Sequence, residues 1–359
     1  MKLFACGVCG QPLMFENTAC VQCGHRLGYD VRTDELLPLD AAGGDLWRPA
    51  SGGEAASYRF CANAAHDVCN WLVPAGSDAQ FCRACLHNRT IPDLNDPKNL
   101  PLWRELEWAK HRLFYTLVKL GLPLVTRRED PQEGLAFDFL TDDGGQQVLT
   151  GHEHGLITLN AKEADAAHRV TMREKMGEVY RTLLGHFRHE VGHYYWDRLV
   201  RDGPMLDEYR DTFGDEREDY DASLKTHYAE GPPADWRDHF ISSYATTHSW
   251  EDFAETFAHY LHIVDTLETA RSFGIAVHAK ETDALDAEAT LNPYKARSMD
   301  AMLAVWSPIA FAVNALNRSM GQPDLYPFVL PPDVVRKLEY IRKLVASSGG
   351  KTAEARRAA

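Results

Sequence analysis

Residues 189–193 read His189-Glu190-Val191-Gly192-His193, an H-E-x-x-H motif inside a stretch with the apolar spacing of a helix. Two histidines four positions apart on a helix direct their rings to one spot. Imidazole nitrogen binds zinc well, and a catalytic zinc site leaves one position open for water. Glu190 lies on the flank of the same face, where its carboxylate can take a proton from that water. The motif therefore predicts metal-assisted hydrolysis, and the alternative is a surface helix with two solvated histidines.

The stretch from about Thr171 to Val200 is predicted as one helix around this motif. Its main apolar stripe is formed by Met172, Met176, Val179, Leu183, Phe187, Val191 and Tyr195. His189 and His193 lie roughly opposite this stripe. We therefore expect the helix to bury one face and to line a cleft with the other.

Two histidines need a third protein ligand. Asp197 shares their face, but positions 189 and 197 lie about 12 Å apart along a helix, too far for one ion. Asp197 is better interpreted as a residue that orients a metal-binding side chain from behind, or as a solvated residue. The segment Ser249–His259 offers carboxylates at Glu251 and Glu255, on a helix predicted to begin with a capping box of Ser249 and Asp252. The alternative is that Glu251 only stabilises the helix N-terminus and Glu255 is solvated.

The eight cysteines all precede residue 86 and form two sets. In a chain without a secretion signal, paired C-x-x-C spacings indicate metal sites. The first set consists of Cys6, Cys9, Cys20 and Cys23, in two C-x-x-C-G knuckles whose glycines permit a tight turn. This spacing predicts a zinc ribbon; the alternative is a pair of redox dithiols.

The second set follows a connector rich in small residues, 41–57, which has the composition of a linker. It consists of Cys61, Cys69, Cys82 and Cys85. Four thiolates are favoured, although His66 could replace one of them, and ligands interleaved between the two sets remain possible. Each segment is too small to bury much core, so bound zinc would have to drive its folding.

Net charge argues against nucleic acid as a partner. The whole chain carries −14, and residues 1–98 hold eight basic and eleven acidic residues. A phosphate-binding surface is instead basic. The cysteine modules are therefore interpreted as structural elements or protein-docking surfaces. Without a signal peptide or a run of 18 apolar residues, we expect a cytoplasmic protein that does not enter a membrane.

The remaining pattern predicts an α+β protein: cysteine-rich zinc-ribbon modules followed by a mainly α-helical domain with a small β-sheet. Strands are expected at 134–140, 147–150 and 155–160, the first two joined as a hairpin and the third bordering a substrate cleft. Further helices are expected at 102–120, 250–267, 295–318 and 332–347. The predicted domains are 1–40 (zinc ribbon), 58–98 (second cysteine module), 99–347 (zincin-like domain) and 348–359 (disordered tail).

The layout of a cysteine ribbon, then Arg188-His-Glu-Val-Gly-His-Tyr-Tyr-Trp-Asp197, then Ser249-Trp-Glu-Asp-Phe-Ala-Glu255 resembles bacterial zinc-binding metallopeptidases with an N-terminal zinc ribbon. The later E-x-x-x-E segment is similar to that of the gluzincins and to the catalytic region of anthrax lethal factor. The resemblance implies that Glu251 is the third zinc ligand. It also implies that Tyr244 stabilises the oxyanion, with His248, Tyr194 and Tyr195 as competitors for that role.

The hypothesis is a zinc metallopeptidase with one catalytic and two structural zinc ions, acting on a protein or peptide substrate. Glu190 would serve as general base, and Glu255, His259 or Asp197 would orient the ligand imidazoles. One alternative is a non-catalytic zinc-dependent interaction scaffold, which the intact Glu190 disfavours. Another is a DNA-associated protease, in which the ribbon would be expected downstream of the motif and more basic.

Overall fold

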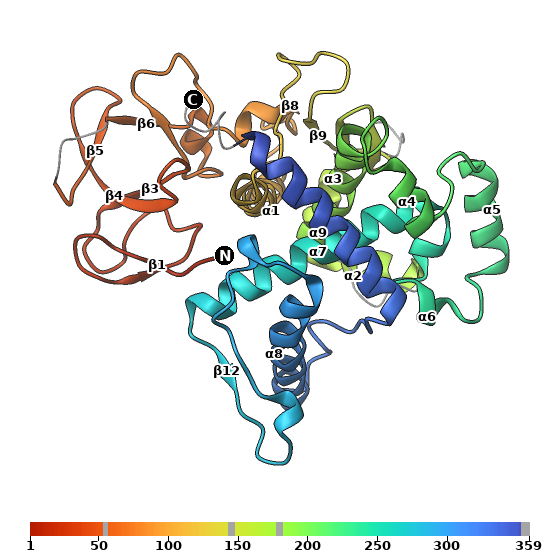
Figure 1. Ribbon diagram of the computed structural model, residues 1–359. Helices are drawn as coiled ribbons and strands as arrows, with labels where there is room; N and C mark the ends of the chain where they lie inside the picture. The colour runs from red at the N-terminus through yellow and green to blue at the C-terminus, as the bar shows by residue number, and fades with distance from the viewer. Residues whose placement is uncertain (53–56, 143–147, 177–181, 353–359) are drawn as a thin grey trace. The chain divides into compact units, whose positions relative to one another are not determined.

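The structure is a computed structural model that describes residues 1–52, 57–142, 148–176 and 182–352 (Figure 1). It contains two compact units. The first comprises residues 1–115, 125–151 and 156–168, and the second comprises 116–124, 152–155 and 169 onward. Both cysteine sets and most strands lie in the first unit, and most helices lie in the second. The predicted α+β class, with cysteine modules preceding a helical domain, is confirmed.

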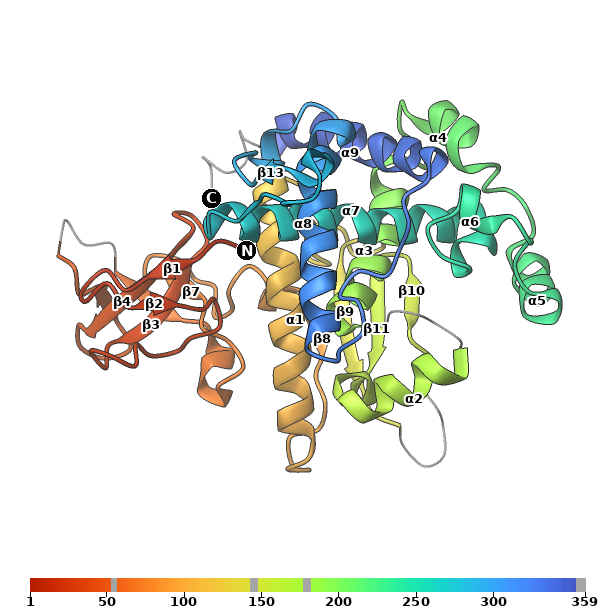
Figure 2. The ribbon, with the colours of Figure 1, turned by 90° about the horizontal axis from the view of Figure 1, so that it is seen from below.

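The N-terminal part of the first unit is built from short antiparallel strands (Figure 2). Strands β1 (Phe4–Ala5) and β2 (Pro12–Leu13) form a hairpin. A second, five-stranded sheet has the order β3-β4-β5-β6-β7. Its strands are β3 (Arg26–Asp30), β4 (Glu35–Ala41), β5 (Trp47–Pro49), β6 (Tyr58–Phe60) and β7 (Leu72–Pro74).

The connector at 41–57 is not a plain linker. Its residues Trp47–Pro49 form β5, which pairs with β4 on one side and with β6 on the other. Trp47 packs edge-on against Phe60, with ring centroids 5.4 Å apart, and Arg26 lies over the Phe60 ring. One sheet therefore connects the two predicted cysteine modules, while residues 53–56 lie outside the described residues.

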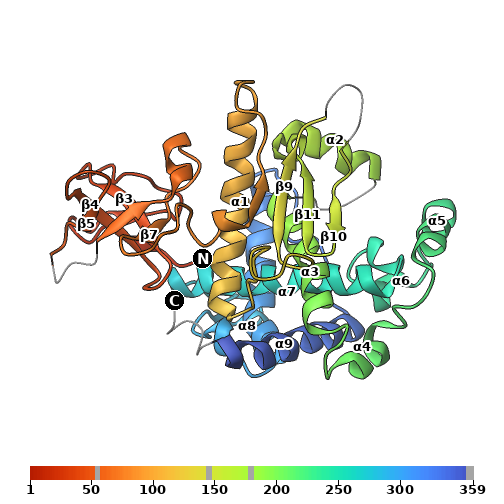
Figure 3. The ribbon, with the colours of Figure 1, turned by 90° about the horizontal axis from the view of Figure 1, so that it is seen from above.

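A third, four-stranded sheet has the order β10-β11-β9-β8, and Figure 3 labels its strands β9, β11 and β10. Its strands are β8 (Asn88–Thr90), β9 (Ala136–Leu140), β10 (Gly151–Glu153) and β11 (Leu156–Asn160). Strand β9 pairs in parallel with β11 and with β8. The predicted hairpin between 134–140 and 147–150 is therefore wrong, although residues 143–147 themselves lie outside the described residues. The hairpin turn instead lies at His154 and Gly155, both with positive φ, as a two-residue turn requires. Strand β11 has neighbours on both sides and is not an edge strand.

Helix α1 (Asn99–Leu120) follows the cysteine modules and realises the helix predicted at 102–120. Leu106, Leu113 and Leu117 of its predicted apolar face are buried. Several polar side chains on α1 are buried too, among them Glu107, Lys110 and His111. The apolar spacing of the sequence did not predict that these polar side chains of α1 are buried.

The second unit is organised around helix α7, which packs against α3, α4, α8 and α9. Its longer helices are α3 (Leu183–Leu199), α4 (Leu206–Phe213), α5 (Tyr220–Glu230), α7 (Ser249–Ser272), α8 (Met299–Ser319) and α9 (Pro332–Thr352). Shorter elements accompany these helices. They are α2 (Ala166–Met176), α6 (Trp236–His239) and the hairpin of β12 (Ala276–Val277) with β13 (Ala287–Glu288). Between α3 and α7, Tyr195 stacks on Phe257 with ring centroids 5.4 Å apart. The helices predicted after residue 246 are confirmed.

The single helix predicted at 171–200 is wrong in two respects. Helix α2 is described as far as Met176. Helix α3 begins after Thr182, which has an extended backbone and caps the helix by accepting a hydrogen bond from the Gly185 amide through its side-chain oxygen. Residues 177–181 lie outside the described residues. In addition, α3 is buried all round from Phe187 to Trp196, so it does not present one open face.

Helix α7 begins at Ser249, as predicted, but its cap differs from the prediction. The N-cap is His248, whose ring nitrogen Nδ1 accepts from the Trp250 amide. Ser249 instead accepts a hydrogen bond from Tyr209, and Asp252 forms an ion pair with Lys337 of α9 at 2.6 Å. The predicted Ser249–Asp252 capping box is therefore wrong, because both side chains are used in packing contacts.

Helix α9 differs from the predicted disordered tail, and helix α8 differs from the expected absence of a long apolar segment. Helix α9 continues through residues 348–352, which were predicted as part of a disordered tail, and 353–359 lie outside the described residues. Among the described helices, α8 alone is long and apolar enough to cross a membrane, although no such helix was expected. Core helices can have the same length and composition, so α8 by itself is weak evidence for a membrane span.

Candidate metal centre

Helices α3 and α7 bring His189, His193 and Glu251 together within the second unit. The Nε2 atoms of the two histidines lie 3.2 Å apart. Glu251 Oε2 lies 3.0 Å from Nε2 of His189 and 3.4 Å from Nε2 of His193. All three residues are buried, with exposed fractions of 9, 3 and 2%. The structure thus forms a compact triangle of two imidazole nitrogens and one carboxylate oxygen.

This triangle has the dimensions of a tetrahedral zinc site. Zinc binds nitrogen and carboxylate oxygen at about 2.0–2.2 Å, which places two tetrahedral ligand atoms about 3.3 Å apart. Oε2 of Glu251 is also buried without a hydrogen-bond donor among the described residues. Leaving a buried carboxylate oxygen without a donor is costly unless a cation compensates for it. The donor set and its geometry therefore fit a divalent metal ion.

Glu255, one helical turn beyond Glu251, is held differently. Its Oε1 lies 2.7 Å from Nδ1 of His189, and its Oε2 accepts from the Ser242 hydroxyl at 2.7 Å. Although burial alone would raise the pKa of Glu255, the contact with His189 lowers it to about 2. An ionised Glu255 fixes the proton on Nδ1 of His189 and turns Nε2 toward Glu251 and His193. This is the usual arrangement of a carboxylate behind a metal-binding imidazole.

Glu190 projects from α3 beside the histidine pair. Its Oε1 lies 3.2 Å from Nε2 of His186, one turn earlier on the same helix. Burial alone would raise the pKa of Glu190, but His186 and the two motif histidines lower it. The carboxylate is therefore ionised near neutral pH and is able to accept a proton.

Two tyrosines lie at the same site. Tyr220 of α5 donates its hydroxyl to Oε1 of Glu251 at 2.7 Å, which leaves Oε2 to face the histidines. Tyr244 begins the 3-10 helix η4 (Tyr244–Thr246), and its ring centroid lies 6.0 Å from that of His189. Burial, reinforced by the charge of Glu251, raises the pKa of Tyr244 far above its usual value. The Tyr244 hydroxyl thus remains protonated and able to donate.

The competing candidates for the role of Tyr244 have other contacts. Both ring nitrogens of His248 are engaged, one by the Trp250 amide and the other by the Glu218 carbonyl at 3.2 Å. Tyr195 donates to the Pro123 carbonyl, and its ring packs against that of Tyr194. Tyr244, in contrast, has its ring beside that of His189.

His259 and Asp197, the other residues predicted to orient the ligand imidazoles, lie beside other side chains. His259 bonds through Nδ1 to the Tyr326 hydroxyl at 2.7 Å. Asp197 lies 4.0 Å from His152 and 3.2 Å from Arg201. The Trp250 ring covers His193, with centroids 3.8 Å apart. Glu255 is thus the predicted orienting residue that the structure places in hydrogen-bond contact with a motif histidine.

The first cysteine set lies around the β1–β2 hairpin. The Sγ atoms of Cys6 and Cys23 lie 3.6 Å apart, as do those of Cys9 and Cys20. Four sulfurs around zinc at about 2.3 Å would lie about 3.8 Å apart. Gly10 and Gly24, which end the two knuckles, have φ angles of 75° and 76°. These left-handed conformations favour glycine, as the C-x-x-C-G pattern predicts.

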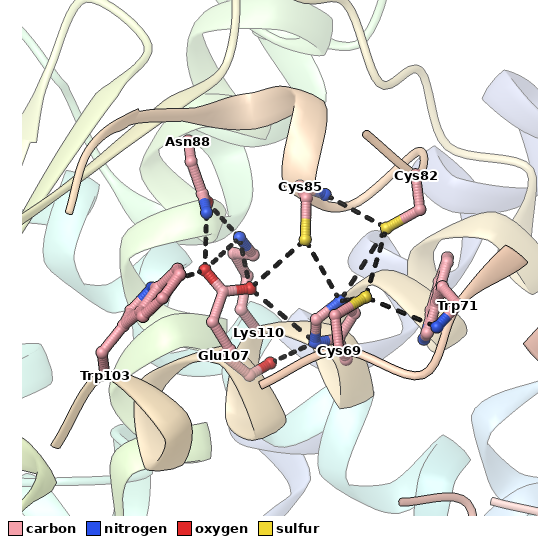
Figure 4. Close-up of polar contacts among 9 residues, drawn as sticks. Cys69, Trp71, Cys82, Cys85, Asn88, Trp103, Glu107 and Lys110 are labelled. Atoms are coloured by element: carbon pink, nitrogen blue, oxygen red, sulfur yellow. Dashed lines mark hydrogen bonds and ion pairs between the residues drawn. The ribbon is translucent and has the colours of Figure 1, made fainter. Parts of the chain in front are cut away.

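The second cysteine set is buried throughout. Cys69 and Cys82 have Sγ atoms 3.8 Å apart and accept from the amides of Trp71 and Cys85, respectively (Figure 4). His66, the predicted substitute for a thiolate, packs on Trp103 with ring centroids 5.6 Å apart. The ligands are not interleaved, because each cysteine set forms its own cluster.

Several residues of the candidate site did not emerge from the sequence. Tyr220, Ser242 and Trp250 reach it through tertiary packing, and their sequence spacing carries no signal. His186 could have been found, because it lies one helical turn before Glu190 on the same face. Trp250 begins the helix predicted at 250–267, but nothing in the sequence indicates its contact with His193.

Two family models match this chain. A family model described as "putative zinc-binding metallo-peptidase" matches residues 99–344. The chain belongs to this metallopeptidase family. A zinc-ribbon domain model matches residues 3–96, so the metallopeptidase carries its ribbon at the N-terminus. The two matched regions meet between β8 and α1.

Relatives of this metallopeptidase occur in mycobacteria. Uncharacterized proteins of Mycobacterium bovis and of Mycobacterium tuberculosis are each 42% identical to it over 346 residues. The matches cover 96% of this chain and 95% of each relative. No solved structure matches the chain significantly.

Proposed function

We propose that the chain is a zinc-dependent peptidase with a gluzincin-like site, in which His189, His193 and Glu251 hold the catalytic metal. The observation that carries the proposal is the triangle of donor atoms with sides of 3.0, 3.2 and 3.4 Å. The unpaired Oε2 of Glu251 and membership of a zinc-binding metallopeptidase family support it. Zinc bound there would polarise the scissile carbonyl group and make a water molecule more acidic.

The protein's own groups account for the proton movements. Glu190, ionised and beside the histidine pair, accepts a proton from water and returns it to the leaving amine. Tyr244 donates a hydrogen bond to the carbonyl oxygen as that oxygen gains charge. Glu255 holds His189 through Nδ1, and Tyr220 holds Glu251 through Oε1. The two positioning contacts keep the ligand atoms pointing toward one centre.

A cavity of about 800 Å³ offers room for an extended peptide, although no proposed metal ligand lines it. It lies along α5 and η4, and its wall includes Thr246 and Thr247, which directly precede α7. Tyr220, in the first turn of α5, connects this wall to Glu251. We propose that a protein or peptide substrate enters here.

Partners and location are part of the same proposal. The first unit exposes Val8, Met14 and Val21 near the knuckles, with exposed fractions of 45, 62 and 87%. Such side chains suit a protein partner, whereas the net negative charge of residues 1–98 does not suit nucleic acid. We propose protein docking through the ribbon and a cytoplasmic location.

The Glu190→Gln variant tests the proposed reaction. The variant should retain its zinc and its fold, because Glu190 is not a proposed ligand, yet hydrolysis of a denatured protein or of a peptide library should fall at least about a hundredfold. Glu208→Gln, which removes an exposed carboxylate from α4, serves as the control and should leave turnover unchanged. Undiminished turnover by Glu190→Gln would refute the assigned general base, and the absence of any hydrolysis by the zinc-loaded wild type would favour an interaction scaffold.

A further inference from the structure

Helix α1 brings a histidine against the second cysteine set. His111 is 3% exposed, and its Nε2 lies 3.4 Å from Sγ of Cys69, 3.6 Å from that of Cys85 and 4.0 Å from that of Cys82. Both His111 and the cysteines belong to the first compact unit. His111 therefore faces a triangle of three sulfurs.

The opposite side of the ring determines which nitrogen carries the proton. Nδ1 of His111 lies 2.6 Å from the main-chain carbonyl oxygen of Glu107. A carbonyl oxygen can only accept, so Nδ1 carries hydrogen and the lone pair of a neutral imidazole is on Nε2. A lone pair that faces three thiolates is repelled unless a cation lies between them. Metal-binding histidines commonly donate their other N–H to a main-chain carbonyl in this way.

The distances fit a shared metal ion. With Zn–N at about 2.0 Å and Zn–S at about 2.3 Å, tetrahedral ligands place nitrogen and sulfur about 3.5 Å apart. The three measured separations bracket this value. We propose that His111 binds the second zinc through Nε2 together with Cys69, Cys82 and Cys85, in place of Cys61, whose Sγ also lies within 4.8 Å of the other three sulfurs.

Charge in the surrounding interior supports three thiolates rather than four. Glu107 and Lys110 are both fully buried and paired at 2.9 Å, beside Cys85 (Figure 4). Asn88 and Trp103 donate to the Glu107 carboxylate. The Glu107–Lys110 ion pair has no net charge, so the net charge buried in this region is that of the zinc and its ligands. Zinc with four thiolates carries −2, whereas three thiolates and an imidazole carry −1, which is less costly to bury.

The assignment changes the role of the second zinc. His111 lies in the region matched by the metallopeptidase model, and the cysteines lie in the region matched by the ribbon model. The metal would then fix the first helix of the metallopeptidase region to the ribbon. The inference concerns a structural metal and does not depend on the proposed catalytic activity.

Cadmium-113 NMR of the full chain tests the proposal, because the chemical shift distinguishes four-sulfur from three-sulfur–one-nitrogen coordination at each site. The wild type should show one resonance of each kind from the cysteine clusters. The His111 Nε2 signal of ¹⁵N-histidine-labelled protein should also show coupling to cadmium, which requires no substitution. Two four-sulfur resonances without coupling to His111 would overturn the proposal.

A pair of variants gives an independent test through zinc release to a chelator. His111→Ala should release the second zinc at least about tenfold faster, whereas Cys61→Ser should leave the release rate and the three-sulfur resonance unchanged. His66→Ala serves as the matched histidine control and should behave like the wild type. Loss of the second zinc in Cys61→Ser but not in His111→Ala would establish the four-cysteine site instead.

Discussion

Two glutamates one turn apart on α7 face the same histidine but have different hydrogen-bond environments. Glu255 has both oxygens occupied, by His189 and Ser242. Glu251 has one oxygen held by Tyr220, while the other faces both motif histidines and has no hydrogen-bond donor within the described part of the chain. Residue type and spacing cannot distinguish the two glutamates. Their hydrogen-bond partners differ, and on that basis we propose Glu251 as the metal ligand and Glu255 as the residue that orients His189.

Substitution of each glutamate should separate these roles. Glu251→Ala should abolish zinc binding at this site, because a ligand is lost. Glu255→Ala should weaken zinc binding by about 10–100-fold, as is usual for a residue that orients a metal-binding histidine. Competition with a chelator measures both effects, and Glu208→Gln provides a control on α4. A larger loss in Glu255→Ala than in Glu251→Ala would reverse the assignment.

At the residue scale, the sequence predicted what local spacing encodes. The i, i+4 pair His189 and His193 and the acidic positions on a later helix are visible in the sequence, and the structure brings them together. Tyr220, Ser242 and His111 were not predicted, because each reaches its site from an element that has no fixed sequence distance to it.

At the element scale, the crossing of α3 and α7 depends on a close approach at Gly192. A Cβ atom at this position would lie 2.9 Å from Cα of Ala254 and 3.3 Å from Cβ of Phe257. Both neighbours belong to α7, three to six residues beyond Glu251. The glycine of the motif therefore sets the distance between the histidine pair and its carboxylate.

Gly192→Ala should push the two helices apart. We expect a loss of about 1–3 kcal/mol in the free energy of unfolding, typical of an overpacked core, together with weaker zinc binding at the α3–α7 site. Urea unfolding and zinc titration measure the two effects. Gly76→Ala, where a Cβ meets nothing within 4 Å, is the control. Unchanged stability and zinc affinity in Gly192→Ala would contradict this account of the crossing.

Burial of His259 on α7 should make stability depend on pH. Burial lowers the pKa of His259 to about 4, against about 6.5 in an unfolded chain. Between these values the unfolded state binds a proton that the folded state does not, so the free energy of unfolding falls as the pH falls through this window. The expected loss from pH 7 to pH 5 is about 2 kcal/mol.

His259→Asn removes the titrating group but keeps a polar partner for Tyr326. Its free energy of unfolding should therefore decrease less than that of the wild type between pH 7 and pH 5. Denaturant unfolding of both proteins at the two pH values measures the difference. Equal losses in the two proteins would show that His259 does not titrate in this range.

The elements themselves were largely predictable, since helical periodicity located α1, α7, α8 and α9. The break before α3 was missed because apolar residues keep helical spacing through Thr182, and the cap at Thr182 interrupts the helix regardless. The parallel pairing of β9 with β8 and β11 was missed because such pairing joins residues distant in sequence, whereas the expected hairpin was local.

For the whole molecule, metal content is the property that summarises the three clusters. The cysteine sets and the α3–α7 site predict zinc near three per chain. Atomic emission measurements should give about two for Glu251→Ala and about two for a Cys6→Ser, Cys9→Ser double variant. A wild-type value near one would contradict zinc in the cysteine clusters.

The order of modules along the whole chain was predictable, because cysteine spacing and the H-E-x-x-H motif are both local patterns. The single sheet that joins the two cysteine modules was not predictable, because the small residues of the connector at 41–57 give no strand pattern for β5. The shared sheet and the position of His111 beside the second cluster arise from tertiary structure.

The most direct test is a crystal of the zinc-loaded Glu190→Gln variant, with anomalous diffraction measured on both sides of the zinc edge. We predict an anomalous peak at about 2.0–2.2 Å from Nε2 of His189, Nε2 of His193 and Oε2 of Glu251. A fully loaded crystal with no peak between these atoms, or with Glu251 turned away from the metal, would contradict the proposed centre.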